Sequence, residues 1–491
     1  MKAIKLLSLL LVISLLTSCG IIVINDGKEK GETVSVTTEE ETTYTPNDYD
    51  TKPLPDYEDE AKELLNALPD KDFGGHTVVI ATDEGSSSIW DDVEGPYVSA
   101  VLKRNSFIAD KYNTVVSSSK TTTDALYQAV KQSHLSNDFY ADFASIKSSE
   151  LGTYYGSGSI QNFKALTYRD FTAPYFNEKA IDQMTLGGVI YGVVGSMTES
   201  PESYGCLFFN KTLGREIGIN IDYKSVYNHE FTWDKLFAQI ASAKTENAIL
   251  TSSYDNQTLS NLALLSAGQT YFSRNESGSF VSNFNTDVSQ TVITNLKKLI
   301  PYRADTFTDK NTVTNENGSE STVETVLTGL DIFIKGRALL SVGTVSDMKK
   351  IANCGFEWEI LPIPKLTEGG PYNAAVSDTA PVLVFLGSSH NVEQNGYILQ
   401  ALGASSYKHL QGSYVKYAMD HYVSSYYTFD MLELIIENPV YDHALMFGKN
   451  YSQLRNGTYN AFYNAVITEN TLTYCINKTK ANLQKYLDAA N

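Results

Sequence analysis

Short β-branched runs alternate with amphipathic stretches after residue 76, and this alternation constrains the fold more than any other feature of the 491-residue chain. The candidate strands are 77–81, 114–116 and 141–146, and the candidate helices between them are 97–112 and 123–132. Strands that alternate with helices predict a mainly parallel sheet with helices on both faces. Ligands of such sheets bind beyond the carboxyl ends of the strands. We therefore expect functional side chains in the loops at 82–96, 117–122 and 147–158.

The alternation continues beyond residue 185, and the chain is too long for one small core. Further candidate strands are 189–194, 207–209, 338–342 and 356–361. Further candidate helices are 57–68, 211–217, 233–243, 286–300 and 322–335, while the polar stretch 311–321 is typical of an exposed loop. Thr232 is a suitable N-cap for the helix that follows it. After Phe385 the pattern is mostly helical to Leu487. Because of the length of the chain, we expect two α/β lobes.

The N-terminal segment has the order of features found in secretory signals. Lys2 and Lys5 precede an apolar run at 6–16, which is too short to span a membrane. The ending Leu16-Thr17-Ser18-Cys19 resembles the bacterial lipobox. That resemblance implies removal of a signal peptide at 1–18 and a diacylglycerol on Cys19, and a lipid anchor of this kind holds a protein on a membrane. The alternative is an ordinary signal peptide with a chance cysteine.

The stretch at 19–55 is expected to be a disordered linker. Between Thr33 and Thr45 it consists almost entirely of threonine, glutamate, valine and serine. Such a composition buries too little apolar area to fold. A solvated stalk would let the folded body stand away from the lipid anchor. The expected location is therefore the extracytoplasmic face of the cell membrane.

Charge and cysteine content exclude several classes of protein. The formal net charge is -19, and no cluster of lysine or arginine interrupts the acidic background, which argues against nucleic acid as a partner. Beyond residue 19 the cysteines are Cys206, Cys354 and Cys475. Their odd number and wide spacing fit neither a disulfide framework nor a zinc site. Reduced thiols are expected, with one disulfide plus a free thiol as the alternative; no metal and no cofactor is expected.

Three pairs of segments, in order and spacing, resemble the extracellular solute-binding proteins of ABC importers, family 1, which mostly carry sugars. The segments are Asp72–Ile80 with Arg104-Asn105, Leu207–Leu213 with Phe231–Leu236, and Phe333–Leu340 with Leu361–Lys365. The resemblance covers about 72–490. It implies a sugar-type substrate-binding lipoprotein that acts as a monomer, delivers a small solute to the membrane subunits of an ABC permease, and is not an enzyme.

The same resemblance implies an α/β fold of the periplasmic-binding-protein type II class, with two lobes that are each a mainly parallel sheet flanked by helices. The expected lobe one is 72–197 plus 382–430, and the expected lobe two is 198–381 plus 431–491. The hinge crossings would lie near Met197–Gly205 and Ser377–Val382. A closed state would be selected because the solute touches both lobes.

Sugar recognition needs flat aromatic faces and polar side chains in a largely preformed cleft. The aromatic candidates are Trp90, Tyr154, Trp358 and Tyr372; the alternative for Trp90 is a local packing role, and for Tyr154 it is that of an ordinary exposed loop tyrosine. The polar candidates are Glu84, Glu94, Ser148, Ser149, Glu199 and Asp378. Glu199 and Asp378 fall at the two expected crossings, where carboxylates suit neutral hydroxyl-rich ligands or amines and repel anions.

Other functions remain open at this stage. Acidic pairs such as Asp91/Asp92 and Glu199/Glu202 could in principle supply the acid and base of a glycan hydrolase. The sequence contains no nucleophile elbow, zinc-protease motif or phosphate-binding loop. A sensory or adhesive surface lipoprotein is a further alternative, and peptides or polyamines are alternative ligands.

Overall fold

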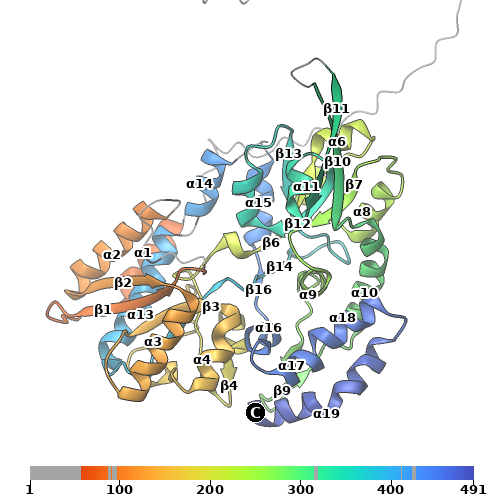
Figure 1. Cartoon of the computed structure of the whole chain (residues 1–491). Helices are drawn as coiled ribbons and strands as arrows, with labels where there is room; N and C mark the ends of the chain where they lie inside the picture. Colours follow the sequence, from red (N-terminus) through yellow and green to blue (C-terminus); the bar gives the residue numbers. More distant parts are fainter. Residues whose placement is uncertain are drawn as a thin grey trace, which may run out of the picture. The chain divides into compact units, whose positions relative to one another are not determined.

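The computed structural model describes residues 57–86, 90, 95, 97–314, 319–410, 412–422 and 427–491 (Figure 1). Three predictions lie outside these residues: the signal peptide at 1–18 with lipidation of Cys19, the linker at 19–55, and the role of Glu94. In the described part, no helix combines the length and the apolar character needed to cross a membrane.

The first sheet has the predicted mainly parallel arrangement. Its strands are β1 (Thr77–Asp83), β2 (Val115–Thr121), β3 (Phe143–Lys147) and β15 (Pro381–Phe385), in the order β15-β3-β1-β2. β1 is parallel to both β2 and β3, while β15 returns from far along the chain and pairs antiparallel to β3. The carboxyl ends of β1, β2 and β3 therefore meet at one edge, as the sequence pattern predicts.

Helices pack against the first sheet where the periodicity places them. They are α1 (Tyr57–Ala67), α2 (Val98–Tyr112), α3 (Thr123–Ser136) and α13 (Val392–His409), and α13 packs against both α1 and α2. Thr122 caps α3 by accepting from the backbone N–H of Ala125. Asn113 ends α2 in the left-handed conformation, at φ 46°, which asparagine tolerates better than most residues. Buried Ile80, Phe143 and Leu399 belong to the shared core.

The second sheet is mixed rather than mainly parallel. Its strands are β6 (Gly205–Asn210), β7 (Ala248–Ser252), β12 (Ala338–Thr344) and β13 (Trp358–Leu361), in the order β13-β6-β12-β7. β12 is parallel to β7, but β6 is antiparallel to both β12 and β13. The reason is that β6 starts where the chain enters this half: Gly205 at the start of β6 pairs with Thr344 at the end of β12.

Short helices surround the second sheet. They are α6 (Lys211–Glu216), α7 (Tyr223–Tyr227), α8 (Trp233–Ile240), α9 (Asn256–Ser266), α10 (Asp287–Leu299), α11 (Leu330–Ile334), α12 (Met348–Ile351) and α15 (Thr428–Ile436). Thr232 caps α8 as predicted, since its hydroxyl accepts from the N–H of Lys235 at 3.4 Å. α15 packs on β13 and α7, so it lies with the second sheet, whereas α13 lies with the first.

The predicted helix at 322–335 is wrong as far as Thr328, and the predicted loop at 311–321 is wrong at its two ends, 311–314 and 320–321; residues 315–318 of that loop lie outside the described residues. β10 (Thr306–Thr314) and β11 (Glu320–Thr328) form an antiparallel hairpin, which projects beyond its neighbours in Figure 1, and only α11 is helical. Val323, Val326 and Leu330 lie three and four residues apart, which imitates a helical stripe. Most residues from Ser321 to Val326 are β-branched or small, however, and such residues favour a strand.

Three stretches of chain run between the two halves and pair with one another. Tyr204 and Val376 form an antiparallel bridge, and the N–H of Ser377 donates to the carbonyl of Ser203 at 2.8 Å. β14 (Ala374–Ala375) pairs parallel to β16 (Pro439–Val440). The third stretch, around β16, was not anticipated. The division of the chain into lobes at residues 197, 381 and 430 stays a prediction.

The C-terminal helices join elements of both halves. They are α16 (His443–Gly448), α17 (Ser452–Gly457), α18 (Tyr459–Ile467) and α19 (Leu472–Ala490). α16 packs on α4 (Leu151–Ser157), and α18 packs on α9 and α10. The remaining elements include α5 (Glu178–Gln183), α14 (Ser413–His421), and the small hairpins β4 (Thr185–Leu186) with β5 (Val189–Ile190) and β8 (Phe272–Arg274) with β9 (Phe280–Ser282).

Candidate functional site

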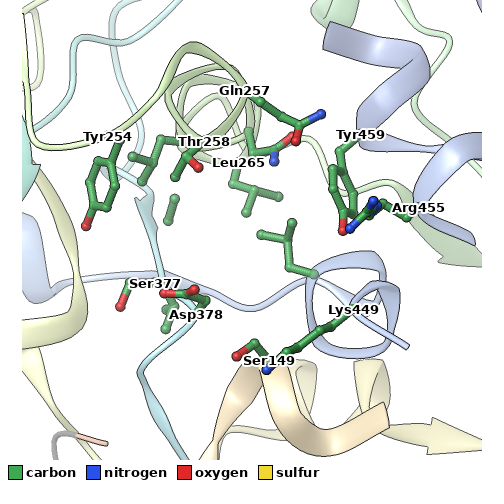
Figure 2. A pocket seen from close by; sticks show the side chains of 15 residues that line it. Ser149, Tyr254, Gln257, Thr258, Leu265, Ser377, Asp378, Lys449, Arg455 and Tyr459 are labelled. Atoms are coloured by element: carbon green, nitrogen blue, oxygen red, sulfur yellow. The ribbon is translucent and has the colours of Figure 1, made fainter. Parts of the chain in front are cut away.

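A cavity of about 260 Å³ is walled by elements of both halves (Figure 2). The first wall is the start of α9, the second joins the loop after β3 to the second crossing, and the third comes from α16, α17 and α18. The lining residues are Ser149, Tyr254, Gln257, Thr258, Asn261, Leu262, Leu265, Ala375, Val376, Ser377, Asp378, Leu445, Lys449, Arg455 and Tyr459. An apolar floor of leucines beneath a polar rim is the usual construction of a site for a small molecule.

The start of α9 positions the first polar wall. Asp255 caps the helix by accepting from the N–H of Thr258 at 2.7 Å. This cap fixes the first turn, so Tyr254, Gln257 and Thr258 are all placed along the cavity. Gln257 also donates to Asn460 Oδ1 on α18 at 2.7 Å, which joins this wall to the C-terminal helices.

The second wall joins the loop after β3 to the second crossing. The Ser149 N–H donates to the carbonyl of Asp378 at 3.2 Å, and the Ser148 N–H donates to the carbonyl of Ala380 at 2.7 Å. The Ser148 hydroxyl donates to the carbonyl of Ser377 at 3.0 Å. These bonds place Ser149 and Asp378 side by side, as both the strand-end rule and the predicted hinge position suggested.

The third wall carries a half-buried tyrosine and two cations. Tyr459 is the first residue of α18, and burial raises its pKa although the neighbouring Arg455 works in the opposite direction. Figure 2 shows the Arg455 and Tyr459 side chains lying together. Lys449 forms an ion pair with Glu150, a carboxylate that is almost fully buried just after Ser149.

Tyr254 is held neutral by its surroundings. Burial raises its pKa, the nearby carboxylates Asp347 and Asp378 raise it further, and a hydrogen bond with Thr344 opposes them. A neutral phenol both donates and accepts, which suits a hydroxyl-bearing ligand. With the amides of Gln257 and Asn261, the cavity offers donors and acceptors around two aromatic rings.

The described residues hold no group of three or more His, Cys, Asp or Glu side chains that could bind a metal ion. Within the part of the chain described here, Cys206, Cys354 and Cys475 are free thiols. The cavity lining itself combines hydroxyl, amide and charged side chains with leucines, which suits a polar solute.

The two tryptophans predicted as ligand contacts are buried in the protein core instead. Trp90 is 2% exposed, and the Arg104 guanidinium lies 5.0 Å from its ring centre. Trp358 packs edge-on against Phe208 in the second sheet. These tryptophan rings lie outside the cavity lining.

Two predicted tyrosines are buried in the same way. The ring of Tyr154 packs against Tyr127 at 5.5 Å, and the hydroxyl of Tyr372 donates to the carbonyl of Val226 at 2.9 Å. Among the polar candidates Ser148 is buried beside the cavity, and Glu84 is exposed after β1. Glu199 lines a different pocket.

The residues that supply the aromatic rings here, Tyr254 and Tyr459, were not singled out in the sequence. Tyr254 follows the carboxyl end of β7 by two residues, so the strand-end rule applied to the second half would have found it. Tyr459 had no such signal, because its place depends on how α18 packs against α9 and α17.

Two solved sugar-binding proteins have a similar structure. A cyclo/maltodextrin-binding protein complexed with maltotetraose superposes with a TM-score of 0.53 at 12% identity, covering 84% of this chain and 97% of that chain. The cyclic alpha-maltosyl-1,6-maltose binding protein from Arthrobacter globiformis superposes with a TM-score of 0.54 at 14% identity, covering 84% of this chain and 98% of that one. This chain has their two-lobe fold. No protein-family model and no curated protein sequence matches it.

Proposed function

We propose that the protein captures a small carbohydrate, most simply an oligosaccharide, between its two lobes and delivers it to an ABC importer. The observation that carries the proposal is the cavity itself. Its walls come from both lobes and from a hinge crossing, in a fold shared with two proteins that bind maltose-type oligosaccharides. A ligand that touches both lobes favours the closed state, and a permease would recognise that state.

The polar and aromatic groups of the cavity can be assigned to parts of a sugar. Tyr254 and Tyr459 would pack their rings on the C–H faces of the pyranose. Asp378, Gln257 and Asn261 would bond hydroxyl groups, and the buried leucines beneath them would exclude water. Arg455 and Lys449 at the rim would donate to ring or glycosidic oxygens, because their own partners leave donor hydrogens available.

The finer parts of this function rest on the sequence. The lipobox-like ending at Cys19 supports a lipid anchor, and it supports a location on the extracytoplasmic face of the membrane. The resemblance of three ordered segments to family-1 solute-binding lipoproteins supports ABC permease subunits as partners. Delivery to a permease is favoured over a sensory or adhesive role, because the cavity is built to enclose a solute.

The test is a thermal-shift and calorimetric screen of the purified protein against mono- and oligosaccharides, with peptides and polyamines as controls. At one hundred times the dissociation constant a ligand adds roughly 2.7 kcal/mol to the free energy of unfolding. Stabilisation by one saccharide class, lost in Tyr459→Ala and kept in Tyr474→Ala on exposed α19, is the expected result. Stabilisation by peptides or polyamines alone would overturn the sugar assignment, and release of smaller saccharides would support a hydrolase instead.

A further inference from the structure

A second pocket, with a volume of about 460 Å³, lies at the hinge and shares no lining residue with the cavity described above. We name it the hinge pocket. The first crossing contributes Ser196, Glu199 and Tyr204 to it, the third contributes Asn438 and Tyr441, and α13 contributes Tyr407. It therefore sits where two crossings and a helix of the first lobe meet.

Glu199 is the unusual group in this pocket. Among the described residues no hydrogen bond or ion pair is formed by its carboxylate. Burial raises the pKa of Glu199 to about 7, and no hydrogen bond or counter-charge from the described residues opposes that shift. A partly buried carboxylate that lines a pocket without a partner is poorly compensated, and a cation placed beside it would offset that cost.

Two tyrosines beside Glu199 also favour a cationic ligand. Tyr204 is 2% exposed and Tyr441 is 8% exposed, and both line the pocket. In the described part of the chain, neither of these two hydroxyls has a hydrogen-bond partner. Each ring lies close enough to Glu199 for that carboxylate to raise the tyrosine pKa. Aromatic faces beside a carboxylate attract a cation by both the ring quadrupole and the charge.

The charges of the pocket favour a cation over an anion. Its lining contains the carboxylates of Glu178, Glu199 and Glu437 and a single ammonium group, that of Lys179. The net charge is negative, so anionic ligands are disfavoured. A compact ion with an apolar surface matches aromatic walls better than a strongly hydrated metal ion does, because the metal ion gives up its water only to several oxygen ligands.

We propose that the hinge pocket is a second binding site and that it takes a small organic ammonium ion, with Glu199 as the counter-ion and tyrosine rings as the walls. This site is separate from the carbohydrate cavity and does not depend on the proposed function. Its occupant is an additional ligand, held at the joint between the lobes.

The experiment is a calorimetric titration of choline chloride into the purified protein at pH 8. Saturable binding is expected, and Glu199→Gln should weaken it by about tenfold or more, since the counter-charge is removed at constant shape. Glu216→Gln, an exposed carboxylate on α6, should bind as the wild type does. The neutral isostere 3,3-dimethyl-1-butanol should not bind. Tyr459→Ala, which alters the carbohydrate cavity, should leave choline binding unchanged.

A second variant covers the case in which Glu199→Gln fails to fold. Tyr441→Leu removes one aromatic wall and should weaken choline binding severalfold. The proposal is overturned if choline gives no saturable heat, or if the neutral isostere binds equally well. It is also overturned if Glu199→Gln and Tyr441→Leu bind choline as the wild type does, or if Tyr459→Ala abolishes binding, which would place the cation in the other cavity.

Discussion

The backbone N–H of Ser149 donates to the carbonyl oxygen of Asp378 at 3.2 Å, which joins the loop after β3 directly to the second hinge crossing. The two side chains therefore line the same cavity although they lie 229 positions apart in the sequence, at 149 and 378. A ligand bound by Asp378 is in contact with the crossing segment itself, so binding and lobe movement share a residue.

Replacing Asp378 with asparagine should weaken saccharide binding by roughly tenfold or more. A charged hydrogen bond to a ligand hydroxyl contributes about 1.5–3 kcal/mol, and the amide keeps the shape without the charge. Isothermal titration with the saccharide found in the screen measures the change, and Asp110→Asn on exposed α2 is the matched control. Equal affinity in wild type and Asp378→Asn would remove Asp378 from the ligand contacts.

Glu199→Gln should stabilise the ligand-free protein at pH 8 and have a much smaller effect at pH 5. The folded-state pKa of about 7 lies above the ordinary glutamate value of 4.5, so the folded protein prefers the protonated acid. That contribution is fully present below pH 4.5 and is lost as the pH rises through 7. Urea unfolding at the two pH values should show a gain of about 1–2 kcal/mol at pH 8. A gain of the same size at pH 5 would contradict the electrostatic cause.

His443 should make the protein sensitive to acid. It is fully buried, its Nδ1 lies 2.7 Å from the carbonyl of Gln183 and its Nε2 lies 2.7 Å from the Tyr486 hydroxyl. Burial lowers its pKa to about 4, so the neutral ring donates from Nδ1 and accepts at Nε2. Because the folded-state pKa lies below the ordinary histidine value of 6.5, the stabilising contribution is present above pH 6.5. It is lost as the pH falls toward 4.

The measurement for His443 is the free energy of unfolding at pH 7 and pH 4.5 in wild type and His443→Gln. Glutamine can donate and accept at comparable positions but does not titrate. The wild type should lose about 2 kcal/mol more than the variant between these pH values. Parallel losses in both proteins would assign the acid sensitivity to other groups.

Arg274 should stabilise the contact between β8 and α5. Its guanidinium forms an ion pair with Asp182 at 2.6 Å and donates to the backbone carbonyls of Asp182 and Thr185. Arg274→Lys keeps the charge but not the planar set of donors, so it should cost about 1–3 kcal/mol of unfolding free energy. Thermal unfolding measures this loss, and Arg215→Lys, in a pair that is more than half exposed on both sides, should change stability very little.

The sequence predicted the first sheet well, because its signals are local. The β-branched run of β1 and the helical spacing of α2 appear in short windows, and Thr232 is recognisable as a cap from the residues next to it. Strand β11 fell within the predicted helix at 322–335, because Val323, Val326 and Leu330 follow helical spacing. The antiparallel direction of β6 was not predictable, since it depends on where the chain enters the second half.

Only part of the candidate site could be predicted from the sequence. Ser149 and Asp378 were found from a strand end and an expected crossing, which are features of topology. Trp90 was chosen because it lies in a loop, but its burial against Arg104 depends on tertiary packing that no local pattern reports. Tyr459 lies in the cavity only because α18 packs against α17 and against α9, and α9 is far from both helices in the sequence.

The pairing of three crossing stretches has a mechanical consequence. Two strands side by side form a ribbon that can twist as well as bend. The bridge between Tyr204 and Val376 and the pairing of β14 with β16 turn that ribbon into a three-stranded strap. A strap of hydrogen-bonded strands resists twisting and shear within its own plane but folds easily about a line across it. Movement of the two lobes about such a strap would therefore be restricted to opening and closing along one path.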